Sequence, residues 1–181
     1  FCYNHYMAQH TIHILDPIVA QRIAAGEVIE RPASIVRELV DNSIDSGATH
    51  ISVELLEGGI ESLRVVDDGC GIEPRDLPLC AHSHATSKVD TLEDLESLHT
   101  MGFRGEALAS ISSVSDFIIQ TRLVGSMEGT QLSVIDNKNE ISEVSCRQGT
   151  KIEVKHLFKH VPARKAYLKT STTEYNHILD V

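Results

Sequence analysis

The sequence lacks the features of membrane, secreted and disulfide-rich proteins. It has no apolar run near the ~18 residues that a membrane helix needs, and no basic start followed by an apolar middle that would indicate a signal peptide. Its four cysteines, Cys2, Cys70, Cys80 and Cys146, form no CxxC pair, which disfavours disulfides and a structural zinc. We therefore expect a soluble, cytoplasmic protein with free thiols and no membrane partner. An alternative metal site at Cys80, His82 and His84 stays open.

Positive charge is also scarce. Lysine and arginine number 16 against 26 aspartate and glutamate residues, which gives a formal net charge of -10. Because neutralisation of phosphates supplies most nucleic-acid affinity, this chain alone is not expected to bind nucleic acid strongly. A length of 181 residues fits one large domain. The non-periodic "FCYNHY" is interpreted as a leader, residues 1–6, in front of a domain over residues 7–181.

The stretch "RPASIVRELVDNSIDSGAT", Arg31 to Thr49, predicts an amphipathic helix. Pro32 lies near its start and Gly47 just past its end. Its apolar residues recur at helical spacing, at Ile35, Val36, Leu39, Val40 and Ile44. Glu38 and Asn42 are one helical turn apart and flank this apolar stripe, where they either face a ligand or have a purely structural role.

The remaining pattern predicts the fold class. Residues 50–69 alternate apolar and polar side chains around Gly58-Gly59, which is typical of a β-hairpin. Further strands are predicted at residues 115–123, 129–136, 139–146 and 149–157, and a closing helix at residues 171–181. Helices gathered early and strands gathered late favour an α+β two-layer sandwich with helices on one sheet face.

Residues 67–105 form a long connection rich in glycine, histidine, threonine and serine, and such connections are usually functional. Within "VVDDGCGI", Asp67 stands at a strand end and is followed by two glycines that permit close backbone approach. Its carboxylate could accept from the exocyclic amine of a flat ligand. The alternative is an ordinary Asp-Gly β-turn.

Two further segments predict phosphate contacts. In "MGFRGEALASIS", glycines bracket Arg104 directly before a helix that starts at Glu106 or Ala107, so backbone N–H groups and the helix dipole could hold a phosphate. The GxxxxGK[ST] spacing of a Walker loop is absent. "HATSK", ending at Lys88, could contact phosphate oxygens or be a solvated helix cap. Thr150, at a strand start, could donate to an adenine ring or merely pair across the sheet.

The ordered set of motifs resembles the GHKL ATPase superfamily: E-x-x-x-N on a helix, D-x-G-x-G after a strand, a Gly-Arg-Gly loop before a helix, and G-T before a strand. The strings "IAAGEVIERPASIVRELVDNSIDSGAT", "DDGCGI", "HATSK" and "GFRGEALASISSVS" are similar to the amino-terminal domain of the MutL family, from about Ile12 to the last residue. The resemblance implies a GHKL (Bergerat) fold with a mixed, mainly antiparallel sheet.

It also implies roles for single residues. Glu38 matches the general base that activates water, and Asn42 matches the ligand that holds Mg²⁺ against the phosphates of ATP. Asp67 matches the adenine acceptor, with Gly71 allowing close approach of the ring and Thr150 assisting through its hydroxyl. The remaining matches, a phosphate-side segment and a lid loop, are Thr86, Ser87, Lys88, Gly102, Phe103, Arg104, Gly105, Glu106, Ala107 and Leu108.

As a function, the resemblance implies ATP binding and slow Mg²⁺-dependent hydrolysis that gates homodimerisation and signalling in DNA mismatch repair. The implied partners are a second copy when ATP is bound, a mismatch-recognition protein of the MutS type, and DNA in the full-length protein, with nucleoid association during repair. We expect a fragment truncated before a second, transducer domain. The alternative is an ATP-responsive binding module with negligible turnover. A histidine kinase would need a phosphoacceptor histidine on a separate helix, and none is evident.

Overall fold

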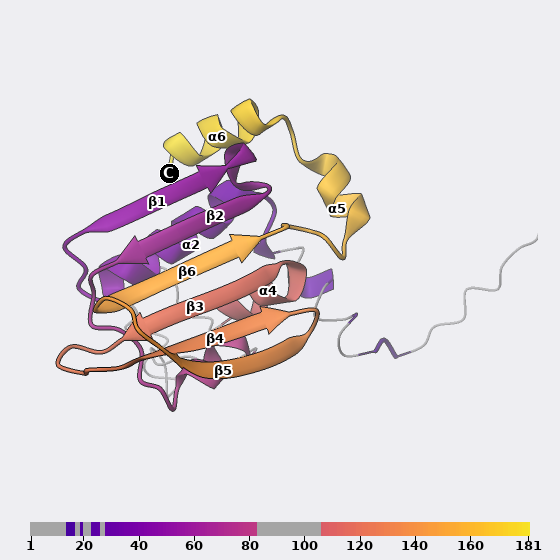
Figure 1. Cartoon of the computed structure of the whole chain (residues 1–181). Coiled ribbons are helices and arrows are strands. Elements are labelled where there is room, and N and C mark those ends of the chain that lie inside the picture. Colours follow the sequence, from indigo (N-terminus) through magenta and orange to yellow (C-terminus); the bar gives the residue numbers. More distant parts are fainter. Residues whose placement is uncertain (1–13, 17–18, 20–22, 26–27, 83–105) are drawn as a thin grey trace, which may run out of the picture.

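The computed structural model describes residues 14–16, 19, 23–25, 28–82 and 106–181. In this part of the chain, six strands form one sheet with the order β1-β2-β6-β3-β4-β5, and each neighbouring pair is antiparallel (Figure 1). The strands are β1 (Ile51–Leu56), β2 (Ser62–Asp67), β3 (Asp116–Arg122), β4 (Gly129–Ile135), β5 (Lys138–Val144) and β6 (Gly149–Lys155).

Helices cover one face of this sheet. The helices α2 (Pro32–Asp45) and α4 (Ala107–Val114) lie behind it in Figure 1. The remaining elements are the 3-10 helices η1 (Glu57–Gly59) and η2 (Leu77–Ala81) and the helices α5 (Pro162–Tyr167) and α6 (Ser171–Leu179). The predicted two-layer α+β sandwich is confirmed, but the expected mixed sheet is wrong for the described strands, because every neighbouring pair is antiparallel. In the described ranges, no helix combines the length and apolarity that crossing a bilayer requires.

The core follows from strand and helix periodicity. Alternate side chains of β2, β3 and β6 point toward the helices and are buried, whereas those on the opposite face are only half-buried. The inward residues include Leu63, Val65, Phe117, Ile119, Ile152 and Val154. On the open face, Arg64 donates to Glu54 at 2.7 Å and to Glu153 at 3.1 Å. The hydrogen bond to Glu153 raises the pKa of Arg64, although burial opposes this.

The helix phase differs from prediction at one residue. Ile35, Val36 and Leu39 are buried as expected, but Ile44 is 59% exposed, so its expected place on the inner face was wrong. Ser43 is buried there instead, at 3% exposure. Its hydroxyl lies 2.9 Å from the carbonyl oxygen of Leu39, four residues earlier. This bond satisfies the buried hydroxyl, and the helix turns Ile44 outward because successive residues are about 100° apart.

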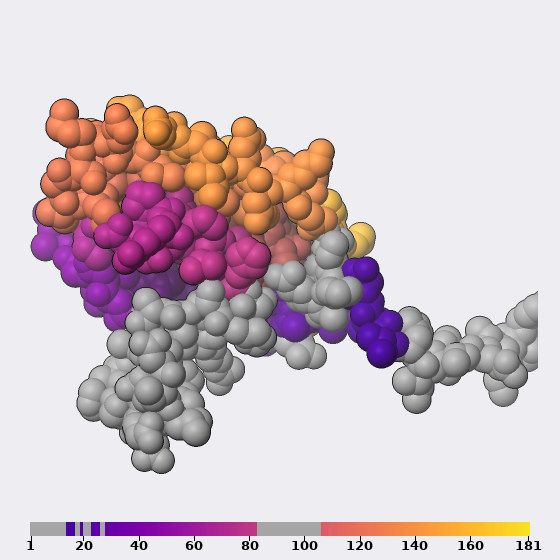
Figure 2. All heavy atoms as spheres, turned by 90° about the horizontal axis from the view of Figure 1, so that it is seen from below, coloured from indigo at the N-terminus to yellow at the C-terminus, as the bar shows by residue number. Residues whose placement is uncertain are grey.

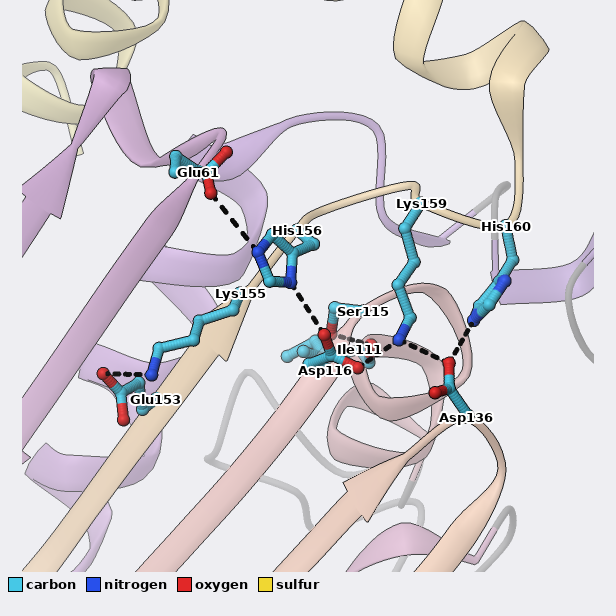
Figure 3. Close-up of polar contacts among 10 residues, drawn as sticks. All are labelled: Glu61, Ile111, Ser115, Asp116, Asp136, Glu153, Lys155, His156, Lys159 and His160. Atoms are coloured by element: carbon cyan, nitrogen blue, oxygen red, sulfur yellow. Dashed lines mark hydrogen bonds and ion pairs between the residues drawn. The ribbon is translucent and has the colours of Figure 1, made fainter.

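A cluster of charged side chains fixes the connection that follows β6 (Figure 3). Asp116, the first residue of β3, accepts from His156 Nδ1 at 2.7 Å and also from Lys159 Nζ. Lys159 donates in addition to Asp136 at 2.8 Å, and the other nitrogen of His156 lies 3.3 Å from Glu61. Because Thr150 and Lys155 stand at opposite ends of β6, this cluster is at the far end of the strand from Thr150.

The Asp116 carboxyl provides the first testable prediction. Burial raises its pKa, but the hydrogen bonds from Lys159 and His156 outweigh burial and lower the pKa below its usual value. The stabilisation is therefore present above the unfolded-state pKa, about 3.9, and is lost as the pH falls through the folded-state value. Asp116→Asn should lower the free energy of unfolding by about 1–2 kcal/mol at neutral pH. Urea unfolding at several pH values measures the difference, which should shrink in acid; a constant difference would show that the charge of Asp116 does not contribute.

Candidate functional site

Three elements converge on the carboxylate of Asp67, the last residue of β2. Its Oδ1 accepts from the backbone N–H of Gly69 at 3.0 Å and of Thr150 at 3.1 Å. Its Oδ2 lies 3.0 Å from the hydroxyl of Ser43 on α2, whose single proton is shared between Oδ2 and the carbonyl oxygen of Leu39 at 2.9 Å. A carboxylate oxygen has about two acceptor positions, so Oδ2 can take one more donor beside Ser43. The sequence predicted Asp67 as an acceptor but gave no indication of Ser43.

The neighbouring carboxylate, Asp68, has a structural role. Its oxygens accept from the backbone N–H groups of Thr49 and His50 at 2.7 and 2.8 Å, and from the Thr49 hydroxyl at 2.7 Å. The backbone donor of His50 and the hydroxyl of Thr49 hold the pKa of Asp68 well below its usual range. Asp68 therefore closes the turn between α2 and β1, while Asp67 continues the inward face of β2 with Leu63 and Val65.

The glycine loop after Asp67 is packed against β3. Gly71 has a φ of +81°, and a Cβ there would lie 2.5 Å from the carbonyl oxygen of Arg122. The backbone N–H of Ile72 donates to the hydroxyl of Thr121 at 2.9 Å. Further along the chain, η2 contacts α4 and β4, and Figure 2 shows this magenta segment beneath the orange strands. Residue 71 must be glycine because a Cβ there would clash with the carbonyl oxygen of Arg122.

Gly149 brings β6 against Asp67 and carries a second prediction. Its φ is +100°, and a Cβ would lie 2.1 Å from the backbone oxygen of Asp67. Gly149→Ala should lower the free energy of unfolding by about 2–4 kcal/mol, because both the backbone conformation and the close contact oppose a side chain. Gly125→Ala is the matched control. Gly125 has a φ of +81° with nothing within 4 Å of a built Cβ, so about 1 kcal/mol is expected there.

Denaturant unfolding of both alanine variants measures this difference. Equal losses for Gly125→Ala and Gly149→Ala would show that the approach of β6 to Asp67 imposes no steric requirement.

Helix α2 carries Glu38 and Asn42 on adjacent turns, and both side chains are half-buried. Residues four apart on a helix have Cβ atoms about 5–6 Å apart, which places a carboxylate and an amide on one side. Ser43 directly follows Asn42 and bonds Asp67. The structure therefore ties the helix with the predicted base and metal ligand to the predicted adenine acceptor through one hydroxyl.

Thr121 is a second residue that sequence reasoning missed. It is 1% exposed and continues the inward positions of β3 after Phe117 and Ile119. Its hydroxyl oxygen lies 3.1 Å from the carbonyl oxygen of Gly149 and 3.2 Å from the hydroxyl of Thr150, which is 8% exposed. A threonine at an inward position of an alternating strand was the available signal.

The predicted phosphate side is only partly described. Helix α4 begins at Ala107 with Glu106 at its N-cap, so the predicted start is confirmed, and Leu108 lies in its first turn. Ala107 and Leu108, assigned to a lid loop by resemblance, are therefore helical. The other predicted residues of this side lie outside the described residues: Thr86, Ser87, Lys88, Gly102, Phe103, Arg104 and Gly105.

The alternative metal site at Cys80, His82 and His84 stays a prediction, because one of its three residues is not described. Across residues 28–82, 106–181 and the short pieces before them, no group of three or more His, Cys, Asp or Glu side chains could hold a metal ion. Burial, and secondarily the charge of Asp76, raises the pKa of the Cys80 thiol to about 11. His82 is exposed, and His84 lies outside the described residues.

A cavity of about 680 Å³ lies elsewhere, beside the first residues of α6, and is not the Asp67 site. It is lined by Arg31, Leu168, Lys169, Thr170, Thr173 and His177.

Comparison with known proteins agrees with this geometry. The family model described as histidine kinase-, DNA gyrase B- and HSP90-like ATPase matches residues 30–165. The DNA mismatch repair protein MutL of Caldanaerobacter subterraneus subsp. tengcongensis is 50% identical over 171 residues, which are 94% of this chain and 29% of that protein. MutL of Actinobacillus pleuropneumoniae is 49% identical over 97% of this chain and 28% of its own length.

Solved structures show the same relationship. The Aquifex aeolicus MutL ATPase domain complexed with ADP is 34% identical, with a TM-score of 0.66 over 84% of this chain and 53% of that chain. The N-terminal domain of a DNA repair protein is 32% identical, with a TM-score of 0.72 over 88% of this chain and 46% of its own. This chain spans less than a third of the curated relatives in length. The chain belongs to the histidine kinase-, DNA gyrase B- and HSP90-like (GHKL) ATPase family, and over this domain it is similar to MutL.

Proposed function

We propose that the chain binds ATP at Asp67 and hydrolyses it slowly to ADP and phosphate with Mg²⁺. The observation that carries the proposal is the Asp67 carboxylate, held by donors from α2, β6 and the glycine loop with acceptor capacity left on Oδ2. An acceptor in this position suits the 6-amino group of adenine. One solved relative, the Aquifex aeolicus MutL ATPase domain, is complexed with ADP, and that adenine nucleotide is in keeping with such a site.

The chemistry is assigned to α2. Glu38 would take a proton from the attacking water, a contribution typically worth about 10²–10⁴ in rate. The amide oxygen of Asn42 suits Mg²⁺, because it binds a hard cation without adding negative charge beside a triphosphate. When bound, the metal neutralises charge that develops on the phosphates. The start of α4, with Glu106, Ala107 and Leu108, is proposed to face the phosphates together with the predicted lid segments.

The biological role rests on the relatives. We infer that ATP binding gates homodimerisation and signalling in DNA mismatch repair, with a MutS-type protein and DNA as partners, in the cytoplasm and at the nucleoid. The relatives are mismatch repair proteins of which this chain matches about 29%. DNA contact is expected mainly from regions outside this chain, since its own net charge is -10.

A second candidate is an ATP-responsive binding module with negligible turnover, since the contacts that converge on Asp67 support binding and do not by themselves require hydrolysis. Titration of the chain with a non-hydrolysable ATP analogue and Mg²⁺, paired with a phosphate-release assay, separates the two. Binding with slow release supports the ATPase, and binding without release supports the module. Without binding, both proposals fail.

A further inference from the structure

The hydroxyl of Thr121 joins the two segments that flank Asp67. It accepts from the backbone N–H of Ile72 in the glycine loop at 2.9 Å, and it lies 3.1 Å from the carbonyl oxygen of Gly149 at the start of β6. It also lies 3.2 Å from the hydroxyl of Thr150. The two threonines are direct partners in the β3–β6 register. A buried hydroxyl with three partners has little freedom to reorient.

The number of protons decides the direction of the contact between the two threonines. A hydroxyl has one proton and two acceptor positions. The N–H of Ile72 can only donate, so it occupies one acceptor position of Thr121. The carbonyl oxygen of Gly149 can only accept, so it takes the proton of Thr121. The remaining acceptor position of Thr121 then receives the proton of Thr150, whose own acceptor positions stay available.

Thr150 shares the inward face of the sheet with Asp67. Its backbone N–H donates to Asp67 Oδ1 at 3.1 Å, and its side chain continues the inward positions of Ile152 and Val154. A ligand that meets the Oδ2 of Asp67 and the Thr150 hydroxyl therefore meets two acceptors. An amino group satisfies both acceptors, whereas an oxo group is opposed by both.

We propose that Thr121 is a specificity-determining positioning residue, which fixes the Thr150 hydroxyl as an acceptor and so makes the site prefer a 6-aminopurine nucleotide over a 6-oxopurine nucleotide. This inference rests on the proposed ATP site. Thr121 itself does not contact the ligand. It acts through Thr150, and through the Ile72 N–H that it holds in the glycine loop.

The test compares ATP with inosine triphosphate, which carries a 6-oxo group. Dissociation constants are measured by calorimetry with Mg²⁺ on the full chain and on Thr121→Val, which keeps the shape but removes the hydroxyl. In this variant the Thr150 hydroxyl no longer has Thr121 as an acceptor. Its proton can therefore point toward the oxo group. The preference for ATP over inosine triphosphate should therefore fall about tenfold, the size of one hydrogen bond.

Two controls separate positioning from packing. Thr121→Ser keeps the hydroxyl and should retain the preference within about twofold, a change much smaller than the loss of a hydrogen bond. Thr130→Val makes the same chemical change at the cross-strand neighbour of Thr121 in β4 and should leave the preference unchanged. Thermal unfolding of every variant measures the structural effect separately.

The outcomes are distinct. If Thr121→Val binds ATP and inosine triphosphate more weakly by the same factor, the preference is intact. Thr121 would then only contribute to packing, and the inference would be overturned. If that variant does not fold, Thr121→Ala gives the same comparison of preferences. Failure of the unaltered chain to bind ATP would overturn the proposed function itself. Loss of preference only in the variants that lack the Thr121 hydroxyl supports both proposals.

Discussion

Asp67→Asn is expected to weaken ATP binding about 100-fold, because it replaces an acceptor by a donor opposite the adenine amine. The Asp67 oxygens already accept from the N–H groups of Gly69 and Thr150, and the hydroxyl of Ser43 lies 3.0 Å from Oδ2. An asparagine has only one acceptor oxygen, so its NH₂ group must replace either Oδ1, where it faces the N–H groups of Gly69 and Thr150, or Oδ2, where it faces the ligand amine. Calorimetric titration with a non-hydrolysable ATP analogue and Mg²⁺ measures the loss.

Asp136→Asn is the matched control for this substitution. Asp136 lies in the turn between β4 and β5, within the charged cluster of Figure 3, and its φ of 49° is one that asparagine tolerates well. ATP affinity should be unchanged in this variant. If ATP affinity is also unchanged in Asp67→Asn, Asp67 does not contact the adenine. Its hydrogen bonds would then only stabilise the fold.

Glu38→Gln should lower the rate of phosphate release by about 10²–10³ while ATP affinity changes little, because the amide cannot take a proton from water. The substitution preserves size, and Glu38 is half-buried on α2. A single-turnover phosphate-release assay measures the rate, and calorimetry with the same variant confirms that nucleotide still binds.

Glu54→Gln provides the comparison for Glu38→Gln. Glu54 accepts from Arg64 at 2.7 Å on the open face of the sheet, away from α2. The rate of phosphate release in Glu54→Gln should equal that of the unaltered chain. Equal release rates in Glu38→Gln and the unaltered chain would show that Glu38 is not the base.

Periodicity allowed most of the elements to be predicted. The alternating pattern of β2 and β3 and the three-to-four spacing of α2 are local properties of the chain. They predicted the hairpin around Gly58-Gly59, the later strands and the covering helix, all of which the structure contains. Ile44 was wrongly placed on the inner face because residue type alone assigned it to the apolar stripe. Ser43 is buried there instead, with its hydroxyl 2.9 Å from the carbonyl oxygen of Leu39.

The arrangement around Asp67 depends on strand order, which local patterns do not contain. Strand β6 lies between β2 and β3, although β4 and β5 separate it from β3 in sequence. Only this order brings Thr150 to both Asp67 and Thr121. Asp67 itself could be predicted because its dipeptide context and strand-end position are local. The roles of Ser43 and Thr121 required knowledge of the tertiary contacts.

The phosphate side stays a prediction for most of its residues. Thr86, Ser87 and Lys88 lie outside the described residues, as do Gly102 to Gly105. The start of α4 agrees with the predicted end of the Gly-Arg-Gly loop, because the helix begins at Ala107. A helix of eight residues there can contribute its positive end to a bound anion.

ATP binding at Asp67 underlies every functional proposal for this chain, and it is measured by calorimetric titration of the unaltered chain with a non-hydrolysable ATP analogue and Mg²⁺. We expect saturable binding with one nucleotide per chain. Binding should be much weaker in Asp67→Asn and retained in Asp136→Asn. An absence of binding up to millimolar nucleotide, or equal binding by all three proteins, would contradict the assignment of Asp67 as the adenine acceptor.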